Sequence, residues 1–205
     1  MRPLLADRII PAILIIAILV VGLGGFVVWR NNHAPKPVPV TTATPTPLAQ
    51  YSVIGQSVQG RDIEAYTYGH GATHLVFAGG MHGGYEWNSV LLAYQFMDYL
   101  NTGTSAVPAN LTVTVIPDIN PDGVFKVVGK EGRFTANDIP TGTSTVSGRF
   151  NADKVDLNRN FDCNWKPKSM WQKKTVSAGS AAFSEPETRA IRDFLLADKP
   201  AAVIF

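Results

Sequence analysis

Apolar and polar positions along residues 51–205 change between a period of two and a helical period, which predicts strands and helices in turn. Short apolar or β-branched runs predict strands at residues 51–54, 63–68, 74–78, 111–116 and 201–205. The first two of these form an edge hairpin across the Gly60 turn. Apolar residues at helical spacing predict a helix over 86–100, and a second helix begins at a Ser184-Glu185-Pro186-Glu187 capping box and ends at Leu196. Strands that alternate with helices indicate an α/β domain with a mixed, largely parallel sheet flanked by helices.

Two segments between these elements are expected to be irregular. The first, residues 117–123, follows the strand 111–116 and has the turn-forming sequence Pro-Asp-Ile-Asn-Pro-Asp-Gly. The second, residues 129–148, is rich in Gly, Thr and Ser and predicts a long connection, which is a length usually tied to function or disorder.

The N-terminal fifty residues differ in composition from the rest. Residues 9–29 are uncharged and apolar, and a helix of about 20 such residues spans a hydrocarbon core of about 30 Å. We therefore expect a tail at 1–8, a transmembrane helix at 9–29, a Pro/Thr-rich linker at 30–50 and a globular domain at 51–205. A cleaved signal peptide is the alternative, but it has a shorter apolar region followed by small residues.

The linker predicts where the domain lies. Proline alternates with Val and Thr in this segment, which is typical of a semi-extended spacer that holds a domain away from a surface. Charges on the two sides of the span are nearly balanced, so the positive-inside rule separates the orientations poorly. The spacer favours an N-terminus inside the cell, and we expect a single-pass membrane protein with an extracytoplasmic domain.

Charge and cysteine content exclude some classes. The chain has 18 basic and 16 acidic residues, a net charge of +2, and its basic residues form no stripe, so we expect no nucleic-acid partner. Cys163 is the only cysteine, so the chain has no internal disulfide. Two alternatives remain open for this residue: a buried free thiol, or a disulfide with a cysteine beyond Phe205.

Polar residues capable of chemistry follow the predicted strands. His82 and Glu86 come after the strand 74–78, at the edge where open α/β sheets build their sites. Together with the Asn-Pro-Asp-Gly turn at 120–123 and Arg149 followed by Asp-Leu-Asn-Arg-Asn-Phe at 156–161, this sequence resembles the zinc carboxypeptidase family of metallopeptidases. The resemblance covers residues 51–205, which would then be a peptidase domain.

The resemblance implies a metal site. His82 and Glu86 would bind one zinc ion together with a second histidine much further along the chain, and the carboxylate of Asp156 would orient the imidazole of His82. The family spacing is H-x-x-E, whereas this chain has H-x-x-x-E; positions i+3 and i+4 share one face at a helix start. For His82 the alternative is a turn histidine that bonds to the backbone.

The resemblance also implies a site for a peptide with a free C-terminal carboxylate. Asn158 and Arg159 would hold that carboxylate, because a guanidinium binds it with two hydrogen bonds. Arg149 would polarise the scissile carbonyl and stabilise its oxyanion, and Arg133 is the fallback for that role. For each arginine the alternative is a surface ion pair.

The site is expected to be incomplete. Catalytic zinc needs three protein ligands, and the remaining histidines are His33, His70 and His74. Since the family places its second zinc histidine and its general-base glutamate in the C-terminal part, we expect a truncated, inactive fragment of a metallocarboxypeptidase that hydrolyses C-terminal residues of proteins or cell-wall peptides. The capping box accounts for Glu185 and Glu187, so neither replaces the base.

Two other functions are weighed against this one. A membrane-tethered domain could keep a carboxylate or peptide pocket without catalysis. A serine esterase of the α/β-hydrolase type has a His-Gly-Gly loop similar to residues 82–84, but it needs a G-x-S-x-G motif that this sequence lacks.

Overall fold

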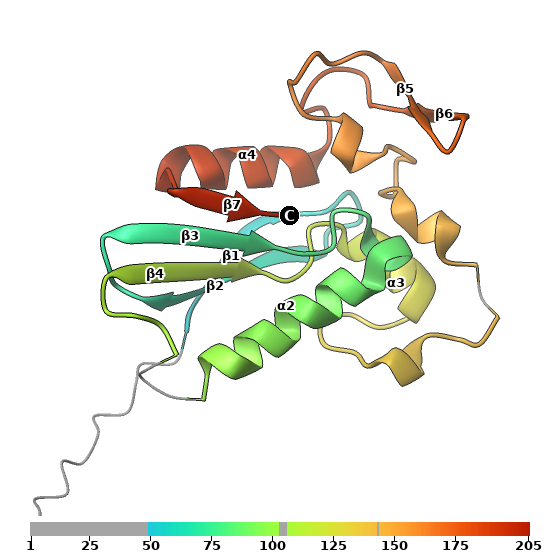
Figure 1. Cartoon of the computed structure of the whole chain (residues 1–205). Coiled ribbons are helices and arrows are strands. Elements are labelled where there is room, and N and C mark those ends of the chain that lie inside the picture. The colour runs from blue at the N-terminus through green and yellow to red at the C-terminus, as the bar shows by residue number, and fades with distance from the viewer. Residues whose placement is uncertain (1–48, 103–105, 143) are drawn as a thin grey trace, which may run out of the picture. The chain divides into compact units, whose positions relative to one another are not determined.

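The computed structural model describes residues 49–102, 106–142 and 144–205, which form a five-stranded sheet flanked by helices (Figure 1). The strand order is β1-β2-β4-β3-β7, with the strands β1 (Gln50–Gln56), β2 (Asp62–Gly69), β3 (Thr73–Ala78), β4 (Leu111–Ile116) and β7 (Ala202–Ile204). β1–β2 and β2–β4 pair antiparallel, whereas β3 pairs parallel with both β4 and β7. The predicted mixed sheet and edge hairpin are confirmed, but parallel pairs are not in the majority.

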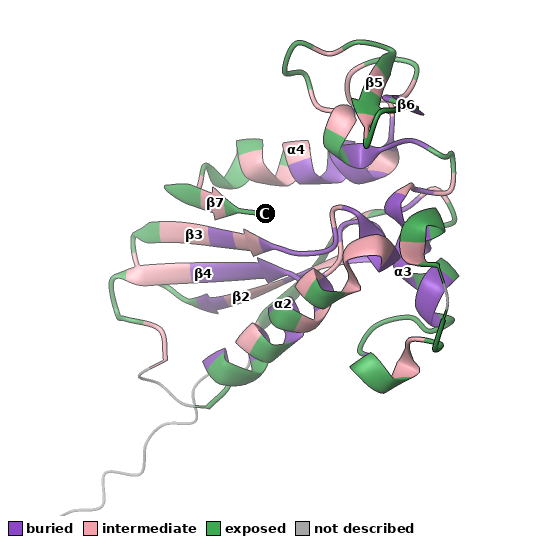
Figure 2. Cartoon of the chain, turned by 45° about the vertical axis from the view of Figure 1, so that its right-hand side comes forward, coloured by how far each residue is buried: buried purple, intermediate pink, exposed green. Residues whose placement is uncertain are grey.

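Helices cover both faces of the sheet. α2 (Trp87–Leu100) lies on one face and α4 (Pro186–Asp198) on the other (Figure 1). Because successive strand residues point to opposite faces, Val115 packs with Val90 on the α2 side, whereas Ile116 packs with Ile191 on the α4 side. Burial of each such side chain stabilises the fold by roughly 1.5–3 kcal/mol. Buried residues extend from the sheet into the loops at the carboxyl ends of β3 and β4 (Figure 2).

A helix missing from the sequence prediction follows β4. α3 (Pro121–Val128) begins inside the segment 117–123 that turn-forming residues predicted to be a loop. The Asn120 side chain caps it by accepting from the Gly123 backbone N–H at 3.0 Å, and Pro121 occupies its first turn. Proline is favoured at this position, because its absent N–H would have no helical partner there.

The predicted long connection at 129–148 follows α3, and the described residues from there to Arg159 include three short 3₁₀ turns. These are η2 (Ala136–Asp138), η3 (Thr145–Arg149) and η4 (Leu157–Arg159). A second sheet then appears, the hairpin of β5 (Lys168–Trp171) and β6 (Lys174–Ser177). This polar, lysine-rich hairpin has no alternating apolar pattern, and its turn residues Gln172 and Lys173 both have positive φ without being glycine.

The capping box predicted for α4 is wrong. Glu185, not Ser184, precedes the first helical residue, and no side chain caps the helix. The Ser184 hydroxyl instead donates to the Glu185 carboxylate at 2.6 Å. Glu187 turns away from the cap to accept from the Val58 backbone N–H at 3.1 Å, so tertiary contacts have replaced the local motif.

The predicted transmembrane helix at 9–29 and most of the predicted linker at 30–50 lie outside the described residues. Across residues 49–102, 106–142 and 144–205, no helix is both long and apolar enough to cross a membrane.

Candidate active site

The loops that follow the parallel strands β3 and β4 lie at the same edge of the sheet. β3 and β4 pair up to Ala78 and Ile116, and the chains continue side by side, with the Asn120 N–H donating to the Gly80 carbonyl at 3.1 Å. The β3 loop then reaches His82 and the 3₁₀ turn η1 (Gly83–Glu86), and the β4 loop reaches α3. The carboxyl ends of neighbouring parallel strands therefore place the His82 turn against the start of α3.

Glycines allow three backbone segments to touch behind His82. A Cβ atom on Gly84 would lie 2.5 Å from the Gly123 carbonyl oxygen, and one on Gly123 would lie 2.3 Å from the Gly148 carbonyl oxygen. Contacts this short exclude any side chain unless the backbone moves. The segments that carry His82, α3 and Arg149 are thereby held in fixed relation to one another.

His82 is buried between two carboxylates. Its Nδ1 lies 2.9 Å from Glu86 Oε2 and its Nε2 lies 3.4 Å from Asp156 Oδ1, and only 7% of the residue is exposed. Neither ring nitrogen makes a well-aligned hydrogen bond within the described part of the chain, so these short distances are contacts between polar atoms without in-line geometry. The backbone-bonded turn histidine considered as an alternative is therefore not what the structure shows.

Asp156 links His82 to Arg149. Its Oδ2 accepts from Arg149 Nε at 3.0 Å and from Nη2 at 2.8 Å, and the carboxylate is fully buried. Burial acts to raise the pKa of Asp156, but the contacts with His82 and Arg149 outweigh it and lower the pKa below its ordinary value. Asp156 is therefore an anion that stands directly behind the imidazole.

Arg149 is buried in a nest of aromatic rings. The guanidinium lies 4.6 Å from the centre of the Trp171 ring and 5.6 Å from that of Tyr85, and the residue is 3% exposed. Arg149 is thus no surface ion pair, and two of its N–H groups are already used by Asp156. Arg133, the fallback for the oxyanion role, pairs with Asp98 at 2.9 Å and is absent from the residues around the cavity beside His82.

Asn158 and Arg159 open into a cavity of about 750 Å³, which His82 and Glu86 also line. Asp156 precedes η4, so the turn points Leu157 into the core and its next two residues outward. The guanidinium of Arg159 is anchored by donating to the Asn158 carbonyl at 2.9 Å. The imidazole, the carboxylate of Glu86 and a partly exposed guanidinium consequently face one volume.

Two buried asparagines that the sequence did not single out hold this loop. Asn160 Nδ2 donates to the Ala178 carbonyl at 2.7 Å, and its Oδ1 accepts from the Thr188 hydroxyl at 2.6 Å. Asn151 donates to Glu185 at 2.7 Å and to Glu187 at 3.2 Å. Asn160 lies inside the 156–161 motif and Asn151 lies two residues after Arg149, but the structural role of each gives no sequence signal, because it depends on segments distant in the chain.

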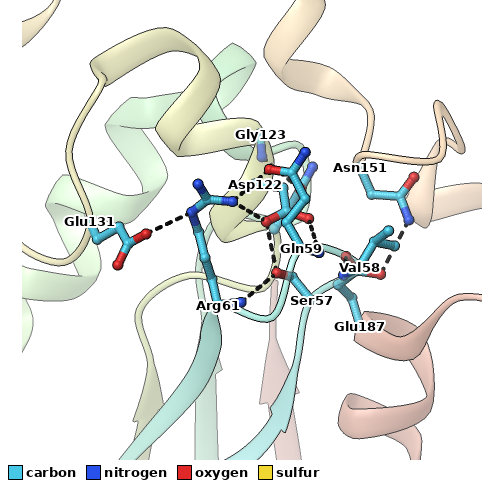
Figure 3. Close-up of polar contacts among 10 residues, drawn as sticks. Ser57, Val58, Gln59, Arg61, Asp122, Gly123, Glu131, Asn151 and Glu187 are labelled. Carbon is cyan, nitrogen blue, oxygen red and sulfur yellow. Dashed lines mark hydrogen bonds and ion pairs between the residues drawn. The ribbon is translucent and has the colours of Figure 1, made fainter.

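A second polar network fixes α3 to the sheet. Asp122 Oδ1 accepts from the Ser57 hydroxyl at 2.7 Å and from Arg61 Nη1 at 2.8 Å, and Glu131 lies 2.9 Å from Arg61 Nε (Figure 3). Burial raises the pKa of nearby Glu187, although hydrogen bonds from Val58 and Asn151 oppose this. The network joins α3 to the turn between β1 and β2, and it contributes no residue to the cavity beside His82.

The sequence profile of the zinc carboxypeptidase family, peptidase M14, matches residues 41–204. The chain belongs to the zinc carboxypeptidase family. Among curated relatives, a 27% identical match is the "Gamma-D-glutamyl-L-diamino acid endopeptidase 1" of Lysinibacillus sphaericus, with 73% of this chain and 43% of that protein covered. The "Bacteriocin BCN5" of Clostridium perfringens is 31% identical, with 72% and 15% covered. This zinc carboxypeptidase chain thus spans less than half the length of either relative.

Solved structures have the same fold. Carboxypeptidase A from Helicoverpa armigera superposes with a TM-score of 0.52 at 24% identity, covering 72% of this chain and 37% of that one. Murein-tripeptide amidase MpaA from Escherichia coli O157 gives a TM-score of 0.51 at 24% identity, covering 75% and 58%. The fold is therefore shared by proteins named as a carboxypeptidase and as a murein-tripeptide amidase. Because the chain belongs to the zinc carboxypeptidase family, the serine esterase alternative is wrong.

The residues present fit part of the zinc site that this family implies. Buried His82 has ring nitrogens without aligned hydrogen bonds, and the carboxylate of Glu86 lies beside Nδ1. Imidazole nitrogen and carboxylate oxygen are ordinary zinc ligands. In the described part of the chain, no group of three or more His, Cys, Asp or Glu side chains is placed to hold a metal ion. The described residues therefore offer two ligands, not three.

The other candidate ligands lie elsewhere or differ from expectation. His74 Nδ1 contacts Asp198 at 2.8 Å, its Nε2 lies 2.8 Å from the Thr114 hydroxyl, and His70 is exposed in the loop between β2 and β3. Cys163 is exposed and lines the cavity, so the buried free thiol is wrong.

Proposed function

We propose that this chain forms one part of the active site of a zinc-dependent metallocarboxypeptidase, which hydrolyses C-terminal residues of peptides. His82 and Glu86 would hold one Zn²⁺ ion, Asp156 would orient the imidazole, and Asn158 with Arg159 would bind the terminal carboxylate. The observation that carries the proposal is a buried imidazole whose Nδ1 faces a carboxylate of the substrate cavity and whose Nε2 faces a second, fully buried carboxylate.

A carboxylate lies on each side of the His82 ring. With a zinc ion bound at Nδ1, Asp156 would accept the ring proton that remains on Nε2, because an acceptor stabilises an N–H that points toward it. Nδ1 lies on the side of Glu86 and the cavity, so these two groups would be placed to bind the same cation.

Arg159 and Arg149 have different tasks in this proposal. The partly exposed Arg159 can offer a pair of N–H groups to a carboxylate inside the cavity, and Asn158 can add an amide donor. Arg149 is held by Asp156 and two aromatic rings, so any polarisation of the scissile carbonyl would use the N–H groups that this ion pair leaves free. When bound, zinc would supply Lewis-acid polarisation and a water of lowered pKa.

The third zinc ligand and the general base are proposed to come from a histidine and a glutamate outside these 205 residues. The 205-residue chain would then bind zinc weakly and lack peptidase activity. Glu187 is not a substitute for the base, since its carboxylate is buried and already bonded to Val58 and Asn151. A non-catalytic, carboxylate-binding domain is the second candidate, and it is favoured by the two-ligand count among the described residues.

Calorimetric titration with zinc tests the proposal directly. We expect one weak site in the unaltered chain and at least about a tenfold loss of affinity in His82→Ala and Glu86→Gln, because each removes one of two ligands. His70→Ala serves as the control, since this exposed histidine lies outside the cavity, and it should bind zinc as the unaltered chain does. Equal affinity in His82→Ala and the unaltered chain would remove the metal site.

A chain that continues past Phe205 with the missing ligand and base separates the two candidates. The carboxypeptidase predicts chelator-sensitive release of C-terminal residues by this longer protein. A longer protein that binds free carboxylates without hydrolysis would instead support the binding domain.

We also propose that residues 9–29 anchor the domain to a membrane as a single-pass helix and that the domain faces away from the cytoplasm. The support is the length of the uncharged apolar stretch and the proline-rich spacer after it. Membrane fractionation with external protease treatment tests this: the domain should sediment with membranes and be cleaved from outside. Recovery in the cytosolic fraction would contradict it.

A further inference from the structure

Part of the wall of the cavity beside His82 is built by a segment of unusual charge. Residues 163–177 contain four lysines and neither Asp nor Glu, so this segment carries more positive charge than the net +2 of the whole chain. It includes the β5–β6 hairpin and the loop before it. The rest of the chain is therefore slightly acidic, and the positive charge is concentrated beside the candidate site.

Two of these lysines face the cavity itself. Lys166 and Lys168 both line the volume of about 750 Å³ that also contains Arg159. Neither forms an ion pair with a carboxylate of the described residues, whereas Lys130 and Arg133 elsewhere on the surface do. Among the side chains of the described lining residues, the only acidic one is that of Glu86, which the proposed zinc ion would neutralise. Three cationic side chains then line a space in which no other acidic side chain remains among the described lining residues.

The wall has a fixed position relative to the site. Trp165 Nε1 donates to the Ala178 carbonyl at 2.9 Å, and the hairpin residue Trp171 stacks edge-on against Tyr85 of η1 with ring centres 5.3 Å apart. Trp171 also contacts Phe150 at 6.2 Å and the guanidinium of Arg149. Aromatic contacts of this kind each add about 0.5–1.5 kcal/mol beyond burial, so the hairpin is attached to the segments that carry the site residues.

We propose that Lys166 and Lys168 recognise a second carboxylate of the substrate, so that the site prefers peptides with an acidic group close to their C-terminus. This rests on the proposed function, in which Arg159 takes the terminal carboxylate. A cavity of this size falls within the range of about 300–1,000 Å³ that holds small ligands, so both carboxylates of a short peptide fit inside it. The second carboxylate can come from a Glu side chain or from the free α-carboxylate of a γ-linked Glu.

Binding of three matched peptides to the full chain with zinc tests the inference. The probes are N-acetyl-Ala-Glu-Ala, N-acetyl-Ala-γ-D-Glu-Ala and N-acetyl-Ala-Gln-Ala, which keeps the terminal carboxylate but lacks the second one, and binding is followed by NMR shift titration. We expect at least one Glu peptide to bind roughly three- to tenfold more tightly than the Gln peptide, the range expected for two partly exposed ion pairs. The tighter of the two Glu peptides identifies the source of the carboxylate.

Variants assign the preference to the wall. Lys166→Gln combined with Lys168→Gln should abolish the preference for Glu and leave binding of the Gln peptide unchanged. Lys173→Gln combined with Lys174→Gln is the matched control, because it removes the same charge from the same segment outside the cavity lining; it should keep most of the preference.

The outcomes separate this inference from the proposed function. If Arg159→Ala abolishes binding of all three peptides but Glu and Gln peptides bind equally to the unaltered chain, the acidic preference is wrong and the carboxylate site remains. A preference lost equally in both lysine pairs would also overturn it, because the effect would then be a general charge effect. If no peptide binds, the proposed carboxylate site fails and the inference fails with it.

Discussion

The buried ion pair between Asp156 and Arg149 gives the sharpest prediction about how this site is held together. Asp156→Asn removes the negative charge that faces both Arg149 and His82, and Arg149 is buried, with 3% of the residue exposed. Breaking a buried pair on one side typically costs about 3–5 kcal/mol, because the remaining charge has no partner. Native domains have only about 5–15 kcal/mol of total stability, so the variant should unfold at a much lower urea concentration.

A double-mutant cycle measured by urea denaturation isolates the pair. Arg149→Met should be destabilising for the same reason, since it leaves Asp156 buried with only the 3.4 Å contact to His82. The double variant Asp156→Asn with Arg149→Met should be less destabilised than the sum of the two single variants, by about 1–3 kcal/mol. Additive effects, or single variants that each cost less than about 1 kcal/mol, would refute the reasoning that the pair is buried and coupled.

Three further predictions concern the glycine contacts, the buried glutamate and the carboxylate site. Gly84→Ala should lower the free energy of unfolding by about 1–3 kcal/mol, as measured by denaturation, because the new Cβ would lie 2.5 Å from the Gly123 carbonyl oxygen. The same substitution should weaken zinc binding, and a zinc affinity equal to that of the unaltered chain would contradict this. The raised pKa of Glu187 means that the folded state favours its protonated form, so its contribution to stability falls as pH rises above the ordinary value of 4.5. Glu187→Gln should therefore flatten that part of the pH–stability curve, and a curve of unchanged slope would assign the effect to other groups. Arg159→Ala should weaken the binding of peptides with a free terminal carboxylate about tenfold or more and leave the binding of the corresponding C-terminal amides unaffected. Equal losses of affinity for both peptide classes would remove Arg159 from the carboxylate site.

Strong local patterns predicted most of the sheet. The β-branched run at 111–116 is β4 to the residue, and the helical apolar spacing after Glu86 gave α2 because that face packs on the sheet. α3 was missed because Pro121 and Gly123 are read as helix breakers, although proline at the first turn and a capping Asn120 are helix-start signals. The β5–β6 hairpin was missed because its contacts, such as Trp171 on Tyr85, join residues far apart in the sequence.

The site was predictable only in part, because its side chains meet through contacts between segments that are separate in the sequence. Asp156 is seven residues from Arg149, but no spacing rule shows that a buried guanidinium folds back onto it. The local Ser184–Glu187 motif failed as a cap because Asn151 and Val58 take Glu187 instead. Local sequence therefore indicates which residues can do chemistry, and long-range packing decides which of them meet.

Zinc binding by His82 is proposed to use Nδ1, with the metal ion shared with Glu86. Nitrogen-15 NMR of the imidazole of His82 during zinc titration tests this most directly, because the two ring nitrogens give separate signals. We predict a zinc-dependent shift of Nδ1 while Nε2 keeps its proton toward Asp156. A shift at Nε2, or signals of His82 that zinc leaves unchanged, would contradict it.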